Sequence, residues 1–239
     1  MKLVENTMRE AYWDHLTTPI VLEDGSLKAP CSLAVKEALF SKFCEQKNKS
    51  LETFLNSHEG SIYWWSDQHF GHENIIKYCA RPFENKDEMS EKLFENYCQK
   101  VTPSDLVIFG GDFMMANKER GLHFLRKMPG KKIQVLGNHD FGHKKKELFY
   151  LFEDSDFDYV VDSLTVEENG VTYFVSHYPL RSSLIPKGVK NIHGHIHDMK
   201  IKGDLHLNMS SEIIGYKPVD LVELISANKA YCLGKEINF

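Results

Sequence analysis

The sequence has little of what disulfide-rich, secreted or membrane-spanning proteins use. Its 239 residues include five cysteines with no close pair among them, namely Cys31, Cys44, Cys79, Cys98 and Cys232. An odd, scattered set suits reduced thiols better than a disulfide framework. No apolar run approaches the length of a membrane span, and the first residues form no apolar signal region. We therefore expect a cytoplasmic protein without a membrane segment.

Positive charge is not in excess, since 29 lysines and arginines face 34 aspartates and glutamates and the formal net charge is −5. This balance argues against a broad basic face for nucleic acid, although divalent ions at a site would add positive charge and keep that partner open. The one basic run, Lys144-Lys145-Lys146, is typical of a solvated helix face. No repeat or low-complexity segment is evident, and the length suits one large domain or one domain with an appendage.

What the chain does have is a series of apolar, strand-like runs that end in polar groups able to bind metals. Five segments show this pattern in sequence order: 62–72, 106–112, 133–140, 171–177 and 191–197. The last segment contains three histidines on alternate residues, which a strand would turn towards one face. Imidazole is the commonest side-chain ligand for divalent metals, and ligands of open α/β sheets bind at the carboxyl ends of the strands. These groups are therefore expected to meet.

Each segment taken alone is weak evidence for a site. A histidine after a strand is commonly a structural residue, and Gly137-Asn138-His139-Asp140 alone is typical of a turn. The complete ordered set is more informative. Five buried strands that end in unpaired polar groups would be costly unless a common partner, such as a metal pair, used those groups.

This ordered set resembles the calcineurin-like metallophosphoesterase family from about Ser61 to the C-terminus. The sequence of residues 66–76, together with Arg81-Pro82-Phe83 downstream, resembles a small bacterial and phage branch of that family. The resemblance implies an α/β fold, a four-layer α/β/β/α sandwich of two mixed sheets flanked by helices. Residues 61–239 would form the catalytic domain. Residues 1–60 would be a small N-terminal accessory extension, with substrate access, an oligomer contact and simple packing all open as its role.

The resemblance also implies two divalent metal ions per chain. One ion would be held by Asp67, His69 and His197, the other by Asn138, His177 and His195, and Asp112 would bridge both. The chemistry agrees independently, because a carboxylate has two oxygens and a metal pair can clamp the attacking and leaving oxygens at phosphorus. Manganese is the expected metal, with iron or zinc as alternatives.

Two neighbouring residues are candidates for catalysis by the same resemblance. His139 is expected to contact the phosphoryl oxygen or to protonate the leaving group. Asp140 is expected to accept a hydrogen bond from the other nitrogen of that ring and fix its tautomer.

Four further residues have less specific assignments. His72 is predicted either to contact a substrate phosphate or to cap the helix that begins after it. Arg81 and Arg181 are candidate phosphate contacts, because a planar guanidinium donates two parallel hydrogen bonds. We interpret His193 as a hydrogen-bonded core histidine rather than as a further ligand.

The resemblance therefore predicts a dinuclear metal-dependent phosphoesterase in which a metal-bridging hydroxide attacks phosphorus directly. A phosphodiesterase acting on a nucleotide-type substrate is the preferred form. A phosphomonoesterase, a nuclease, an amide-cleaving metal hydrolase and a non-catalytic metal-binding interaction scaffold are the alternatives. The sequence specifies neither the natural substrate nor the oligomeric state.

Local patterns predict the elements around these motifs. Helices are expected at 72–79, 87–100, 117–127 and about 144–152, near 51–55, and from a cap at Ser32 to about Gln46. A strand and an Asp-Gly turn are expected within 20–27. Further strands are expected at 159–166 and 171–176, joined by an Asn-Gly hairpin turn, and at 205–209 and 221–225.

Overall fold

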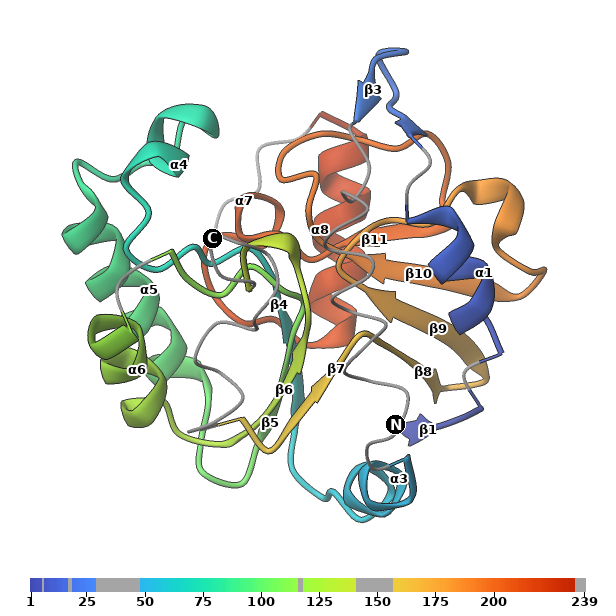
Figure 1. Ribbon diagram of the computed structural model, residues 1–239, viewed down its shortest axis with the longest axis horizontal. Coiled ribbons are helices and arrows are strands. Elements are labelled where there is room, and N and C mark those ends of the chain that lie inside the picture. The colour runs from blue at the N-terminus through green and yellow to red at the C-terminus, as the bar shows by residue number, and fades with distance from the viewer. Residues whose placement is uncertain (6, 17–18, 29–47, 116–117, 141–156, 235–239) are drawn as a thin grey trace.

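The computed structural model describes residues 1–5, 7–16, 19–28, 48–115, 118–140 and 157–234. Its elements alternate between helix and strand in the first half of the described chain and are mainly strands in the middle (Figure 1). No described helix combines the length and apolarity that crossing a membrane requires.

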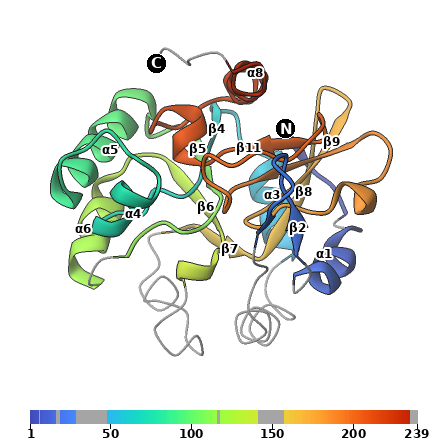
Figure 2. The ribbon, with the colours of Figure 1, turned by 90° about the horizontal axis from the view of Figure 1, so that it is seen from above.

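Four parallel strands form the first sheet. They are β4 (Ile62–Trp65), β5 (Leu106–Phe109), β6 (Lys131–Val135) and β7 (Tyr159–Val161), paired in that order. All four residues of β5 are buried, which matches its continuous apolar sequence and requires cover on both faces of the sheet. The helices α4 (Glu73–Tyr78), α5 (Lys86–Lys100) and α6 (Lys118–Lys127) lie together on one side, away from the other sheet (Figures 1 and 2).

Five strands form the second sheet, in the order β1-β8-β9-β10-β11. The strands are β1 (Lys2–Leu3), β8 (Ser163–Glu168), β9 (Val171–Ser176), β10 (Val189–His193) and β11 (His206–Asn208). The predicted hairpin is confirmed: β8 and β9 are antiparallel, and Asn169 and Gly170 between them both have positive φ. Strands β9, β10 and β11 are parallel, so this sheet is mixed.

The predicted mixed α/β class is confirmed, whereas two mixed sheets stay a prediction, because the four strands of the first sheet are parallel and only an isolated antiparallel bridge joins Trp64 of β4 to Val219. The named strands of the four-stranded sheet pair only in parallel among the described residues. The physical reason lies in its connections, since α4 and α5 link β4 to β5 and α6 links β5 to β6. Helical crossovers of this length join parallel strands. The finer four-layer order stays a prediction.

The two sheets meet just beyond the end of β4. An isolated parallel bridge joins Ser66 to Ser210, in which Ser66 N donates to Met209 O at 2.9 Å and Ser211 N donates to Ser66 O at 3.0 Å. Behind this junction, one hydrophobic cluster takes buried residues from both sheets, such as Ile133 and Ile192. The carboxyl ends of the parallel strands are therefore held beside one another.

The described parts of residues 1–60 pack into the same body. Strand β1 pairs with β8, and α3 (Asn48–Asn56) contributes Leu51 and Leu55 to the shared core. Helix α1 (Arg9–His15) buries Tyr12 against Phe174 of β9, with ring centroids 5.4 Å apart. The short strands β2 (Ile20–Val21) and β3 (Leu27–Lys28) form a hairpin around the expected Asp-Gly turn. The boundary at residue 60 stays a prediction.

The helix predictions near 51–55, 72–79, 87–100 and 117–127 are confirmed as α3, α4, α5 and α6, and the strand prediction at 205–209 as β11. The strand predicted at 159–166 is divided, because β7 and β8 belong to different sheets. The helices predicted at 32–46 and 144–152 lie outside the described residues.

The strand prediction at 221–225 is wrong, because these residues begin α8 (Leu221–Cys232). A capping box starts this helix: Asp220 accepts a hydrogen bond from Glu223 N, and Glu223 Oε2 accepts one from Asp220 N. The reciprocal bonds satisfy free amide groups at the helix start and outweigh the strand-like character of the apolar run.

Candidate metal centre

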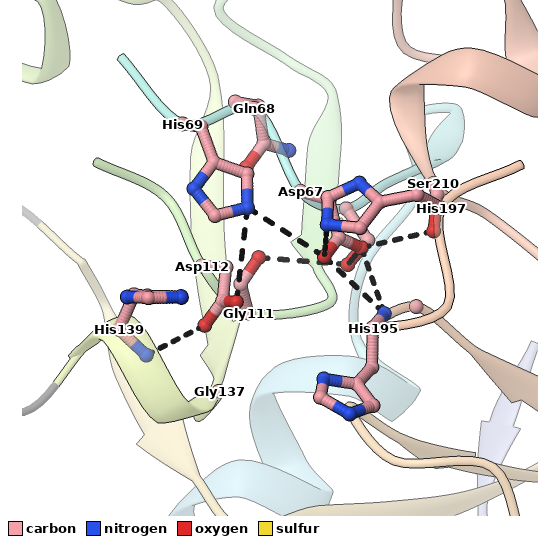
Figure 3. A network of polar contacts seen from close by, with 12 residues as sticks. Asp67, Gln68, His69, Gly111, Asp112, Gly137, His139, His195, His197 and Ser210 are labelled. Carbon is pink, nitrogen blue, oxygen red and sulfur yellow. Dashed lines mark hydrogen bonds and ion pairs between the residues drawn. The ribbon is translucent and has the colours of Figure 1, made fainter. Parts of the chain in front are cut away.

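Seven predicted ligands come together where the parallel strands end, five of which Figure 3 labels. Each follows a strand: Asp67 and His69 follow β4, Asp112 follows β5, Asn138 follows β6, His177 follows β9, and His195 and His197 follow β10. Asn138 begins the short 3-10 turn η1 (Asn138–Asp140). The edge shared by the two sheets thus gathers carboxylates, imidazoles and one amide.

Five of these residues have left-handed backbones. The φ angles are 56° for Asp67, 55° for His69, 56° for Asp112, 68° for His195 and 51° for His197. Positive φ is uncommon outside glycine and costs free energy that the surrounding structure must offset. The local strain is therefore concentrated at one chemical site.

Asp67 Oδ2 accepts most of the hydrogen bonds to this carboxylate, while Oδ1, which also accepts one from His195 N at 3.2 Å, faces the histidines. Its Oδ2 accepts hydrogen bonds from the hydroxyls of Ser66 at 2.6 Å and Ser210 at 3.0 Å, and from His195 N at 3.0 Å. Its Oδ1 lies 3.9 Å from His69 Nε2 and 3.8 Å from His197 Nε2 (Figure 3). The hydroxyls and the amide thus fix the carboxylate, and Oδ1 is presented to two imidazole nitrogens.

Asp112 divides its oxygens in the same way. Its Oδ1 accepts a hydrogen bond from His139 N at 2.8 Å. Its Oδ2 lies 3.8 Å from His69 Nε2 and 3.4 Å from His177 Nε2. One buried carboxylate oxygen therefore lies between imidazoles assigned to two different metals, which is the position that a bridging ligand needs.

The spacing of these atoms fits bound cations. Three groups of described residues have ligand atoms that all lie within 4.8 Å of one another: Asp67, His69 and His197; Asp67, Asp112 and His177; and Cys79, His197 and Glu212. Ligand atoms at about 2.0–2.2 Å from one ion are at most about 4.4 Å apart, and the carboxylate–imidazole distances above satisfy that limit. In addition, the Nε2 atoms of His69 and His195 are buried without a hydrogen bond among the described residues. Orphaned polar atoms of this kind require a partner, and a divalent ion would supply it.

His195 and Asn138 lie beside the second group. The His195 ring centroid is 5.1 Å from that of His177, and Asn138 Oδ1 is 3.3 Å from His177 Nε2 and 3.4 Å from the Tyr178 hydroxyl. The structure thus brings both residues to His177. Their assignment to a second metal stays a prediction.

Two histidines are oriented by bonds from their other ring nitrogen. His177 Nδ1 lies 2.8 Å from Gly110 O, and His197 Nδ1 lies 3.1 Å from Glu212 Oε1. Both bonds leave Nε2 directed at the carboxylates. Glu212, in α7 (Ser211–Ile214), was not among the residues that the sequence singled out, because it follows no strand-end motif. A carboxylate that orients a ligating histidine is a common feature of metal sites.

Arg81 also serves this arrangement. Its buried guanidinium donates to Glu212 Oε1 at 2.7 and 2.9 Å, to Asp67 O at 2.7 Å and to Gln68 O at 2.8 Å. The sequence suggested a phosphate contact, whereas these bonds direct the side chain to the protein. We therefore reassign Arg81 as a positioning residue that joins the loop after β4 to Glu212.

The carboxylates and imidazoles shift one another's protonation. Burial disfavours the cation of each histidine, but Asp112 raises the pKa of His177 to about 9, and Asp67, with Cys79 and Glu212, raises that of His197 to about 11. Burial also opposes the charge of Asp112, yet the histidines around it hold its pKa well below the usual value. Opposite charges thus hold the site together before any metal is bound.

The predicted bond between His139 and Asp140 is not formed. Asp140 instead accepts hydrogen bonds from the backbone amides of Gly137, Asp112 and Phe113 and from Gln134 Nε2. Burial and the charge of Asp112 raise the pKa of Asp140 to about 6. Because η1 turns the two adjacent side chains apart, Asp140 positions the loops that carry Asp112 and Asn138 and does not orient the His139 ring.

The His139 ring is half-buried and faces the site, with its centroid 5.3 Å from that of His69. His72 lies beside both: its Nδ1 is 3.4 Å from His69 Nδ1, and its side chain makes no hydrogen bond that caps α4. His72 thus occupies the N-cap position of α4, but its side chain does not form the capping hydrogen bond. A contact with a substrate phosphate stays a prediction.

His193 and Arg181 lie away from the ligand groups. His193 is buried, and its Nδ1 is 3.0 Å from Gly194 O, as expected for a hydrogen-bonded core histidine. Arg181 is exposed, and its Nη2 donates to Pro19 O at 3.3 Å. The structure thus shows no contact that draws Arg181 towards the described metal-facing residues.

Comparisons with known proteins give one close sequence relative. A scan of the sequence against family models finds no match. The chain is 34% identical over 184 residues to the uncharacterized protein MJ1445 of Methanocaldococcus jannaschii, a match that covers 70% of this chain and 93% of the relative.

Solved structures add a likeness in fold. A protein of unknown function from Aquifex aeolicus, AQ665, matches 70% of this chain and 99% of its own, with a TM-score of 0.54 and 25% identity. A predicted phosphoesterase from Streptococcus pneumoniae matches 65% of this chain and 73% of its own at a TM-score of 0.28 and 16% identity, a likeness too distant to support an argument. Because the sequence match spans nearly the whole archaeal protein, this chain belongs to the same family as MJ1445.

Proposed function

We propose that this protein is a dinuclear metal-dependent phosphoesterase. One observation carries the proposal: Asp112 Oδ2 lies between His69 Nε2 and His177 Nε2, at 3.8 and 3.4 Å, within a set of buried ligands drawn from both sheets. A single carboxylate between two imidazole groups suits a pair of cations, and paired cations are the recurrent solution for displacement at phosphorus.

We assign Asp67, His69 and His197 to one ion and Asn138, His177 and His195 to the other, with Asp112 shared. When bound, two divalent ions neutralise charge on the phosphoryl group and lower the pKa of coordinated water. Manganese remains the expected metal, with iron or zinc as alternatives, because the mixed nitrogen and oxygen ligands suit all three.

The residues of the chain have separate tasks in this proposal. His139 has a half-buried ring beside His69, where it can donate to a phosphoryl oxygen or to the leaving group. His72 lies on the same side, 6.1 Å from His139 between ring centroids, and can contact a second phosphoryl oxygen. The supporting residues act on the candidate ligands: Arg81 donates to the backbone of Asp67, Asp140 accepts from the backbone of Asp112, and Glu212 orients the His197 ring.

The preferred substrate is a phosphodiester of nucleotide type. Activity would be measured with bis(4-nitrophenyl) phosphate and 4-nitrophenyl phosphate in the presence of Mn²⁺. Faster turnover of the diester supports a phosphodiesterase, and faster turnover of the monoester supports a phosphomonoesterase. Cleavage of single-stranded DNA beyond the rate on the small diester would identify a nuclease.

Asp112→Asn tests the catalytic proposal. We expect kcat/KM for the better ester to fall at least about a hundredfold, because the amide cannot bridge two cations as a carboxylate does. The control is Asp204→Asn, at an exposed position, which should retain activity. Two bound ions with no hydrolysis of any ester would indicate a metal-binding scaffold, and fewer than two ions would contradict the dinuclear assignment.

A further inference from the structure

Three imidazoles surround the outer side of the candidate metal centre. The ring centroids of His69 and His72 are 5.2 Å apart, those of His69 and His139 are 5.3 Å apart, and those of His72 and His139 are 6.1 Å apart. His69 is buried, whereas His72 and His139 are half-buried. The group therefore leads outward from the buried ligand to the surface.

Tyr78 continues this path to the surface. It ends α4, and its ring lies edge-on to His72, with centroids 6.5 Å apart and planes at 79°. The side chain is 74% exposed, which is the largest exposure among the described large hydrophobic residues. A tyrosine ring loses little conformational entropy on binding and offers a flat apolar face to a ligand.

Met115 is a second exposed apolar residue, and its segment runs beside the residue that precedes His72. Phe70 and Met114 form a parallel bridge, and Met115 N donates to Phe70 O at 2.9 Å. This register places Met115 beside Gly71, next to His72. Met115 is 38% exposed, and an unbranched thioether can adjust to the edge of an aromatic group. Tyr78 thus lies against His72, and the backbone of Met115 passes beside Gly71, the residue before it.

We propose that Tyr78 and Met115 form a stacking rim for the base of a nucleoside phosphate whose phosphate lies at the metal centre. This inference rests on the proposed phosphoesterase function and identifies the class of substrate that the site accepts. The imidazoles suit the phosphate, and the aromatic face suits the base, since bases stack on tyrosine largely independently of their identity.

Binding of two probes, thymidine 5′-monophosphate and inorganic phosphate, to Mn²⁺-loaded protein tests the rim by calorimetry. We expect Tyr78→Ala to weaken binding of the nucleotide about tenfold, because stacking on one aromatic side chain accounts for a change in affinity of that size. Inorganic phosphate should bind equally well to both proteins. Tyr78→Phe should retain nucleotide affinity, since the ring and not the hydroxyl is required.

Val222→Ala is the matched control, because Val222 is 72% exposed on α8 and lies outside the rim. It should leave both affinities unchanged. Thermal unfolding of each variant checks folding, and Tyr78→Ala should match the parent because the side chain is exposed. A nucleotide that binds no more tightly than phosphate, or that binds Tyr78→Ala as well as the parent, overturns the rim while leaving the proposed activity intact.

Hydrolysis of two diesters separates the two proposals further. Thymidine 5′-(4-nitrophenyl phosphate) and methyl 4-nitrophenyl phosphate share a leaving group and differ in the nucleoside. Tyr78→Ala should raise KM about tenfold for the first and leave the second unchanged. An equal effect on both esters contradicts base stacking. If the parent protein neither binds phosphate nor hydrolyses either ester, the phosphoesterase function itself fails, and the rim fails with it.

Discussion

At the scale of single residues, each oriented histidine uses one ring nitrogen for the protein and presents the other to the site. His197 shows this most clearly, because Glu212 Oε1 is 3.1 Å from Nδ1 while Asp67 Oδ1 is 3.8 Å from Nε2. Glu212 is itself held by Arg81. The ring is thus set for coordination before a metal arrives.

Removing the charge of Glu212 should weaken binding of the ion that we assign to His197. For Glu212→Gln we expect a loss of about 10–100-fold in Mn²⁺ affinity at one of two sites, because the carboxylate fixes the ring and raises its basicity. Calorimetric titration would resolve the two affinities. Glu95→Gln is the control, since Glu95 is exposed on α5. Unchanged affinity at both sites would contradict the positioning role.

Protonation should compete with metal binding. The raised pKa values of His177, about 9, and His197, about 11, make both residues cations in the metal-free protein at neutral pH. A ligating histidine must be neutral, so binding at neutral pH should release about two protons, and affinity should rise with pH through about 9 for His177 and on to about 11 for His197. Calorimetry in buffers of different ionisation enthalpy measures the release. An enthalpy that does not depend on the buffer would contradict it.

The same shifts affect the metal-free fold in the opposite direction. Because folding raises both pKa values above the ordinary histidine value of 6.5, the contribution of these histidines to stability is complete below that pH. It declines as pH rises through about 9 for His177 and about 11 for His197. Metal binding and metal-free stability should therefore respond oppositely to pH over this range.

Sequence patterns could locate the ligands but not the residues that support them. Strand-like runs end just before Asp67, Asp112 and His177, and the ends of parallel strands meet in space. Glu212 has no comparable signal, since it lies in a one-turn helix that only the contact between the sheets brings to His197. The predicted hydrogen bond from His139 to Asp140 is based on their adjacency in the sequence, and it does not form because a 3-10 turn separates the two side chains.

At the scale of elements, tight turns after the strands allow the two sheets to approach closely. Gly194 follows β10, and a methyl group there would overlap Ser66 Oγ and Asp67 Oδ2. No larger residue fits without moving the carboxylate that faces His69 and His197. The geometry of the site therefore requires glycine at position 194.

Gly194→Ala should therefore impair metal binding more than a glycine substitution in open space. We expect loss of measurable Mn²⁺ affinity at one site or more and a lower unfolding temperature, because the added methyl group forces backbone shifts in a packed core. Gly188→Ala is the control: its φ of +87° carries a backbone penalty of about 1–2 kcal/mol, but nothing lies within 4 Å of the added carbon. Equal metal binding by both variants would contradict the steric account.

Capping signals at helix starts are as informative as apolar runs for the prediction of secondary structure. The run Leu221–Ile225 has strand character, yet the Asp220 and Glu223 pair that precedes and enters it is a capping signal readable in the sequence. The hairpin at Asn169-Gly170 was predictable because its turn chemistry and both flanking strands agree. Where local signals conflict, the bonds that satisfy a helix terminus decide.

At the scale of the whole molecule, the N-terminal segment contributes to the main structure. Strand β9 is covered on both faces, with Tyr173 and Val175 in the core between the sheets and Phe174 in a cluster with Tyr12 and Leu16. Alternate residues of one strand point to opposite faces, so α1 covers the outer face of β9. The sequence could not show this, because α1 carries no motif that names its partner.

Tyr12→Ala should destabilise the entire fold. Tyr12 is completely buried, and we expect its truncation to cost about 3–5 kcal/mol, as for other large aromatic side chains. Denaturant unfolding followed by tryptophan fluorescence would report it, since Trp64 and Trp65 are buried in the main hydrophobic cluster. Glu10→Ala, at an exposed position of the same helix, should change stability by less than about 0.5 kcal/mol. An unchanged main transition would mean that residues 1–60 behave as a separate unit.

The junction of Ser66 with Ser210 has a consequence for the order in which the protein matures. The two groups of metal-capable residues that contain Asp67 combine side chains from the two sheets, because His197 and His177 follow strands of one and Asp67, His69 and Asp112 follow strands of the other. A nascent chain with only one sheet formed therefore has no complete group. Under the proposed function, acquisition of metal would depend on docking of the sheets, and an incompletely folded chain would have no complete site for ester hydrolysis.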